Sequence, residues 1–220
     1  MDSARFSRRE LAFLIGVPLA WAVLLLFHPL AEGDDPYAEI RDDVNRWLVV
    51  HVGMMIFIPL FAIAIYLLVR GVEKTAAQVC RIALVPFALF YTAWEVLLGI
   101  GTGVLIQDVN ALPADQRGTR STLVNEFTEN ILVRDFGVFN IIGTLSLLTA
   151  TIAAGIALRR QAGVTIAVPI LLGLSGILIA AHPPPFGPTG LVLFIAAVLL
   201  YTRSQPAEQT PAPMQQPHPT

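Results

Sequence analysis

Six apolar segments dominate this sequence, and each is long enough to form a helix that crosses a lipid bilayer. They cover residues 11–28, 47–69, 82–106, 132–158, 164–181 and 186–202. A transmembrane helix needs about 20 residues for a hydrocarbon core about 30 Å thick. Backbone groups at that depth have no water to bond, so such segments form helices. The sequence therefore predicts an all-α integral membrane bundle of six transmembrane helices within residues 1–203.

Composition and charge support this class. The chain has 220 residues, of which 55% are hydrophobic and 14% charged, with a mean hydropathy of +0.67. Soluble domains carry about 25% charged residues. The formal net charge of -2 and the lack of a basic patch argue against nucleic acid as a partner. Cys80 is the only cysteine, which excludes an internal disulfide and a cysteine-based metal site.

The basic residues predict how the chain is oriented. Lys and Arg in short loops are retained on the cytoplasmic side of a membrane. With the N-terminus inside, most basic residues, including Arg8, Arg70 and Arg160, lie at cytoplasmic ends, whereas the outer loops are rich in Asp and Glu. We therefore expect both termini in the cytoplasm of a multi-pass plasma (inner) membrane protein. No cleaved signal peptide is expected, because five further spans follow the first and no cleavage site stands out.

Two segments outside the spans have patterns of their own. In the second outer loop, Leu123, Phe127 and Ile131 recur at helical spacing, which predicts a short amphipathic helix on the membrane surface. It would either cover an outward-facing cavity or only shield the bundle. Residues 204–220 are rich in Pro and Gln, which predicts a disordered cytoplasmic tail that contains His218.

Glu95 is the one formal charge in the third apolar segment, near the middle of that segment. A charged group at the centre of a bilayer is unfavourable by about 2.5 to 3.5 kcal/mol, so it is rarely there without a partner or a function. Small and polar residues share its helix face, and the head of the fourth segment carries two more. The predicted pocket residues are Tyr91, Gly99, Thr102, Asn140 and Thr144.

Three histidines and an aspartate form the second candidate feature. Because successive helices run in opposite directions, His28, His51, His182 and Asp135 all fall near the outer interface, on four different helices. This set suits zinc or another divalent metal with an open position, and two of the imidazoles suit a haem iron. The alternative is a set of independent interfacial histidines. Glu95 is expected about 16 Å below the outer end of its helix, too deep to belong to the same set.

Three functions remain open on these residues. The first is a membrane-embedded metal or haem protein with a redox role or a hydrolase activity on a lipid-like or small-molecule ligand, with Glu95 or Asp135 as acid or base. The second is a small proton-coupled transporter that uses Glu95. The third is a non-catalytic component that binds a partner membrane subunit.

Overall fold

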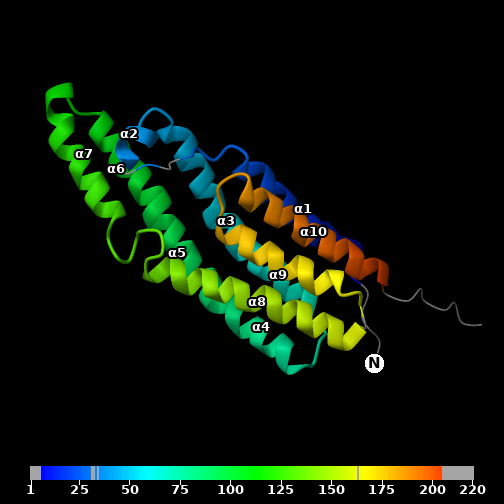
Figure 1. Cartoon of the computed structure of the whole chain (residues 1–220). Coiled ribbons are helices and arrows are strands. Elements are labelled where there is room, and N and C mark those ends of the chain that lie inside the picture. Colours follow the sequence, from blue (N-terminus) through cyan, green and yellow to red (C-terminus); the bar gives the residue numbers. More distant parts are fainter. Residues whose placement is uncertain (1–5, 31–32, 34, 163, 205–220) are drawn as a thin grey trace, which may run out of the picture.

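The structure, a computed structural model, describes residues 6–30, 33, 35–162 and 164–204. Within these ranges all regular structure is helical and no strand occurs, which confirms the all-α class (Figure 1). The predicted tail lies outside the described residues except for Ser204, and His218 lies outside them as well.

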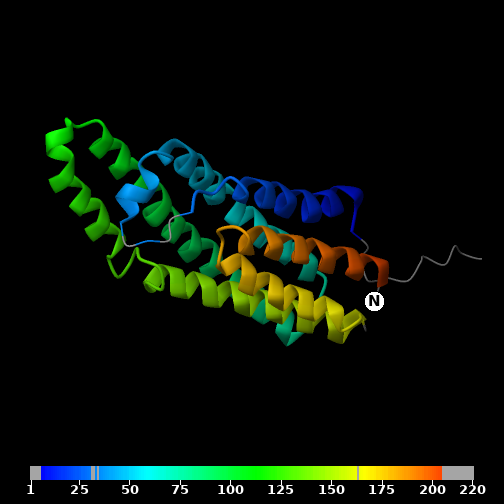
Figure 2. The same cartoon turned by 45° about the horizontal axis from the view of Figure 1, so that its top comes forward.

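Six long helices form the bundle. They are α1 (Arg8–Leu25), α3 (Val44–Val69), the continuous helix Thr75–Asn110 that begins with α4, α8 (Val138–Ala162), α9 (Ala167–Ala180) and α10 (Phe186–Ser204). Each packs against the next in the order α1, α3, α4, α8, α9, α10, and α10 packs back on α1. Figures 1 and 2 show these helices side by side. The result is a closed ring around an apolar core that includes Trp21, Phe61 and Phe194.

The helix Thr75–Asn110 is irregular in the middle. It consists of α4 (Thr75–Pro86), a π-helical turn η1 (Phe87–Tyr91), α5 (Thr92–Trp94), a second π-helical segment η2 (Glu95–Gly101) and α6 (Thr102–Asn110). Pro86 lacks a backbone N–H and directly precedes the first π segment. π-Helical segments are rare and are frequent at functional sites. Glu95 is the first residue of the second segment.

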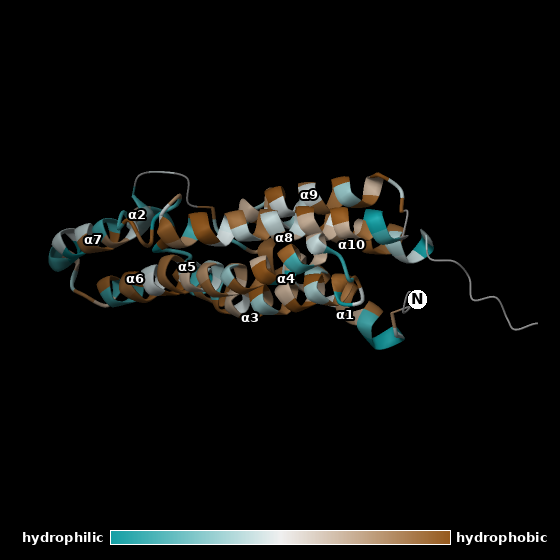
Figure 3. Cartoon of the chain, turned by 90° about the horizontal axis from the view of Figure 1, so that it is seen from below, coloured by the Kyte–Doolittle hydropathy of each residue, from teal (hydrophilic) through white to brown (hydrophobic). Residues whose placement is uncertain are grey.

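Four of the helices are long and apolar enough to cross a membrane. They are Val44–Val69, Thr75–Asn110, Val138–Gln161 and Phe186–Ser204. The other two of the six predicted spans fall short of that standard for visible reasons. α1 begins with Arg8, Arg9 and Glu10. α9 has 14 residues, which span about 21 Å at 1.5 Å per residue. Figure 3 shows hydrophobic residues along the bundle and hydrophilic residues at α7 and at the start of α1.

A second apolar cluster lies beyond one end of the bundle, where α2 (Pro36–Ile40), α6 and α7 (Ala114–Thr128) meet the start of α3. We call this part the cap. Its buried side chains are Tyr37, Ile40, Val44, Trp47, Ile106, Val109 and Val124. The Tyr37 hydroxyl donates to Asn110 Oδ1 at 3.0 Å, and Asn125 Nδ2 donates to Asp35 Oδ1 at 3.1 Å. The cap therefore has its own apolar centre and polar links.

Two predicted element boundaries differ from the structure. In the connection between the third and fourth apolar segments, the helix begins at Ala114 and ends at Thr128, so Ile131 lies beyond it. The buried residues of α7 are Val124 and Thr128, one position after the expected stripe. This face of α7 packs on α2 and α6 within the cap. α8 begins at Val138, so Asp135 lies in the connection before that helix and not in its first turn.

Close packing of α8 on α9 depends on Gly155. A Cβ added there would lie 2.7 Å from Pro169 Cα, whereas a Cβ at Gly16 in α1 would meet nothing within 4 Å. We expect Gly155→Ala to lower the free energy of unfolding by about 1 to 3 kcal/mol through overpacking. Gly16→Ala should be neutral or stabilise by up to about 1 kcal/mol. Unfolding in SDS, followed by circular dichroism, measures both. Equal stability of the two variants would contradict this packing.

Candidate functional site

Unequal helix lengths bring two connecting segments into the interior of the bundle. α1 ends at Leu25 and α9 at Ala180, so His28 and His182 lie just past these helix ends. His51 lies seven residues into α3, about 10 Å from its first residue. All three imidazoles are buried. The connections after the shorter helices therefore reach the depth of the second turn of α3.

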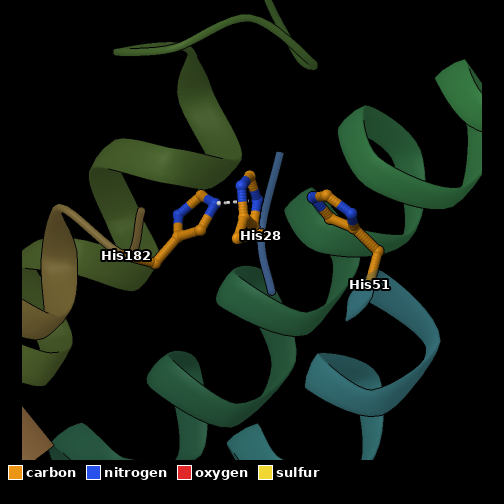
Figure 4. Close-up of side chains that lie close together, drawn as sticks. All are labelled: His28, His51 and His182. Atoms are coloured by element: carbon orange, nitrogen blue, oxygen red, sulfur yellow. Dashed lines mark hydrogen bonds between the residues drawn. The ribbon is translucent and has the colours of Figure 1, made fainter. Parts of the chain in front are cut away.

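The three imidazoles converge. One ring nitrogen from each of His28, His51 and His182 lies within 4.8 Å of the others. The Nε2 atoms of His28 and His182 are 3.2 Å apart. Figure 4 shows His28 between the other two, and its ring centroid lies 4.9 Å from each of theirs. Residues more than 150 positions apart in the chain thus form one compact cluster.

Hydrogen bonds fix the tautomers of two of these rings. His28 Nδ1 lies 2.6 Å from the Pro29 carbonyl oxygen, and His51 Nδ1 lies 2.8 Å from the Trp47 carbonyl oxygen. A carbonyl oxygen only accepts, so both Nδ1 atoms carry the proton. In a neutral ring the Nε2 atom then has a free lone pair. A backbone carbonyl that orients a histidine in this way is a common partner of metal-binding imidazoles.

Glu95 lies against the histidine cluster. Its Oε2 atom is 3.7 Å from His51 Nε2, and its Oε1 atom is 3.6 Å from His182 Nδ1. The residue is 1% exposed. Oε1 has no hydrogen-bond partner among the described residues. A buried polar atom without a partner costs free energy and calls for an explanation, such as a bound ion or water.

The expected depth of Glu95 was wrong. That depth is counted from the end of an apolar segment at Ile106, but the helix continues to Asn110 and its last turns belong to the cap. In addition, α1 and α9 end short of the level at which α3 begins, so His28 and His182 lie deeper in the bundle than expected. Both effects bring the carboxylate and the imidazoles to one level.

Two tryptophan side chains pack against the histidine cluster and are fixed by hydrogen bonds to backbone carbonyls. Trp47 Nε1 donates to the Gly99 carbonyl at 2.6 Å, and Trp94 Nε1 donates to the Val133 carbonyl at 2.8 Å. The Trp47 ring packs on His51, and the Trp94 ring packs on His182. A Cβ at Gly99 would overlap the His51 ring, so glycine is needed there. Trp94 was not among the predicted site residues, and its only signal in the sequence is its position next to Glu95.

A cavity of about 490 Å³ adjoins the cluster at His182. Asp135, Asn140 and Thr144 line it, together with Trp94. Partial desolvation and the neighbouring Glu129 carboxylate both raise the pKa of Asp135, although the residue is exposed at the surface. Asp135 therefore belongs to the cavity and not to the cluster of converging ring nitrogens.

The remaining predicted pocket residues lie elsewhere. Tyr91, Gly99 and Thr102 are buried between helices, and they are not among the residues that line the cavity. The Tyr91 hydroxyl donates to the carbonyls of Ile179 and Ala180, both at 3.3 Å, and so joins the third helix to the end of α9. The predicted pocket is thus divided into a packed seam and an open cavity.

Comparisons with models of known protein families, with curated proteins and with solved structures give no match. The function is therefore inferred from the geometry of the site. Its parts are three converging imidazoles, a buried carboxylate beside them and an adjoining cavity.

The tautomers can be tested directly by ¹⁵N NMR on protein labelled at histidine. We expect His28 and His51 to show a protonated Nδ1 and an unprotonated Nε2, because each Nδ1 faces a carbonyl oxygen. Signals are assigned by comparison with His28→Ala and His51→Ala. A protonated Nε2 in both rings of the wild-type protein would contradict the arrangement.

Proposed function

We propose that this chain is a membrane-embedded metalloprotein that binds one divalent, zinc-like ion on His28, His51 and His182 and hydrolyses a ligand in the adjoining cavity. The convergence of three imidazoles, two of them with Nε2 left unprotonated by a backbone hydrogen bond at Nδ1, carries the proposal. Three protein ligands leave a fourth position for water, which is typical of catalytic zinc sites.

The distances are close to those that a tetrahedral ion requires. Zinc lies about 2.0 to 2.1 Å from imidazole nitrogen, so two ligand nitrogens lie about 3.4 Å apart. The 3.2 Å between the Nε2 atoms of His28 and His182 is near this value. The largest separation in the cluster, at most 4.8 Å, has to shorten. We infer that His51, whose ring lies 6.2 Å from that of His182, moves inward when the ion binds.

Glu95 supplies the charge and the base that such a site needs. Three neutral imidazoles leave the double charge of the ion uncompensated at membrane depth, and the carboxylate lies 3.6 and 3.7 Å from two of the rings. A divalent ion lowers the pKa of a bound water to about 7. With an ion held by the three histidines, Glu95 would accept the proton of the activated water as it adds to a carbonyl carbon. Glu95 would return that proton to the alcohol or amine that leaves as the C–O or C–N bond of the ester or amide breaks.

A haem does not suit this cluster. Two axial imidazoles bind the iron from opposite faces, so the flat macrocycle must fit between them. His51 and His182 are the pair with the widest separation, and the His28 ring lies 4.9 Å from each of them, in that space. The site is therefore proposed for a small ion, in place of the haem alternative.

The proposed topology has six transmembrane helices, both termini in the cytoplasm of the plasma membrane, and the cap with α7 on the outer side. The closed ring supports this, since α1 and α9 complete it between helices that are long enough to span. The basic ends at Arg8, Arg70, Arg160 and Arg203 lie at the opposite end of the bundle from the cap (Figure 1). This distribution follows the rule that basic residues stay inside.

Metal content tests the proposed site. We expect the purified full-length protein to bind about one zinc per chain, and His28→Ala, His51→Ala and His182→Ala each to lower the affinity at least about 100-fold, more than the loss of a supporting residue. His218→Ala is the matched control and should bind as the wild type does. Elemental analysis after equilibrium dialysis gives both values.

Glu95→Gln separates the metal site from the alternatives. It keeps the shape of the side chain and removes the charge, so the zinc affinity should fall about 10- to 100-fold while the fold is kept. Protein that binds no stoichiometric metal would contradict the proposal. In that case a proton-coupled carrier, tested by loss of pH-dependent transport in Glu95→Gln, or a non-catalytic partner subunit would remain.

Topology is tested by cysteine accessibility in intact cells. Cys80 is buried, so Cys80→Ser provides a background without a native thiol. Glu73 and Asp115 are both exposed, in the α3–α4 connection and in α7. An impermeant maleimide should label Asp115→Cys in intact cells and Glu73→Cys only after permeabilisation. The reverse pattern would contradict the proposed orientation.

A further inference from the structure

The cavity beside His182 has a polar end and an apolar end. Asp135, Asn140 and His182 form the polar end. The opposite end is apolar, because Leu145 on α8 and Ile177 on α9 lie further along their helices from Asp135 and His182. Phe136 and Ile141 add apolar lining beside the polar groups. Thr144, Ala180 and Ala181 contribute small side chains to the lining. The volume of about 490 Å³ is within the usual range for ligand sites, about 300 to 1,000 Å³.

The apolar end lies on the lateral surface of the bundle. Leu145 is 57% exposed on α8, and Ile177 is 54% exposed on α9. Exposed side chains on spanning helices of a membrane bundle face lipid. The cavity therefore opens sideways between α8 and α9 into the hydrocarbon region, and it leads inward to His182 in the histidine cluster.

We propose that this cavity takes an amphiphile with one hydrocarbon chain and an uncharged polar head directly from the bilayer, with its head at the polar end and its chain between α8 and α9. The inference names the substrate class of the histidine site, so the hydrolysis of the head rests on the proposed function. The binding step itself needs only the cavity.

Charge selects the kind of head. Asp135 lines the polar end, and Glu95 lies 3.6 Å from the His182 ring that also lines it. With the proposed ion on the histidines, the two carboxylates balance its double charge, so the polar end suits an uncharged head, and Asn140 and Asp135 can bond a hydroxyl, ester or amide. The exposed Leu145 and Ile177 side chains bury apolar surface when a chain lies against them. A monoacylglycerol has this combination of head and chain.

Photolabelling of the full-length protein in phosphatidylcholine nanodiscs tests the inference. The probe is a monoacylglycerol with a diazirine in its acyl chain. We expect labels on the peptides that contain Leu145 and Ile177, and competition by unlabelled monoacylglycerol. Leu145→Trp and Ile177→Trp fill the apolar end and should reduce labelling about tenfold, equivalent to about 1.4 kcal/mol of binding free energy.

Matched controls lie two helical turns away on the same helices. Ile152 on α8 and Ile170 on α9 are 47% and 50% exposed and do not line the cavity. Ile152→Trp and Ile170→Trp should leave labelling unchanged. Labelling spread equally over Ile152 and Ile170, without competition, would overturn the inference. The competition experiment uses wild-type protein, so it decides the question even if a tryptophan variant fails to fold.

Zinc content of the same samples distinguishes the two proposals. Zinc at about one per chain with unspecific labelling leaves the metal site and removes the lateral binding site. Competed labelling at Leu145 and Ile177 without zinc supports the lateral site and removes the metalloprotein.

Discussion

The buried carboxylate of Glu95 is the constraint on which the rest of the site depends. An acid at the depth of an apolar bundle is unfavourable unless something compensates its charge. Here two imidazoles lie 3.6 and 3.7 Å away, and Oε1 has no hydrogen-bond partner among the described residues. Neutral imidazoles do not compensate a negative charge, whereas a divalent ion between them does. The proposed ion would therefore account for the carboxylate and the histidine cluster together.

Helix lengths create the place where these groups meet. α9 has 14 residues and α1 has 18, against 26 for α3, so the connections after the shorter helices lie inside the ring. His28 and His182 are carried by these connections, and the cap covers the same end of the bundle. The second π-helical segment begins at Glu95 and presents the Gly99 carbonyl to Trp47. The site residues are thus brought together by irregular backbone and unequal helix lengths and not by a local sequence motif.

The sequence predicted the helical class and placed His28, His51 and His182 at one end of the bundle, because successive helices alternate in direction. It left open whether the rings converge, which the structure shows. It separated Glu95 from them, since apolarity alone does not show that the third helix runs on into the cap at Asn110. It also predicted one pocket containing Tyr91, Gly99, Asn140 and Thr144. Helix periodicity shows which residues share a face, but it does not show which helix packs against that face. Trp94 and the opening between α8 and α9 depend on packing and have no sequence pattern.

X-ray absorption at the zinc edge of the reconstituted full-length protein tests the central claim most directly, because it reports the atoms bound to the ion. We predict three imidazole nitrogens at about 2.0 to 2.1 Å and one further light atom from water. His28→Ala, His51→Ala and His182→Ala should each remove the imidazole pattern. A spectrum with only oxygen ligands, or with zinc that stays bound after all three substitutions, would contradict the account.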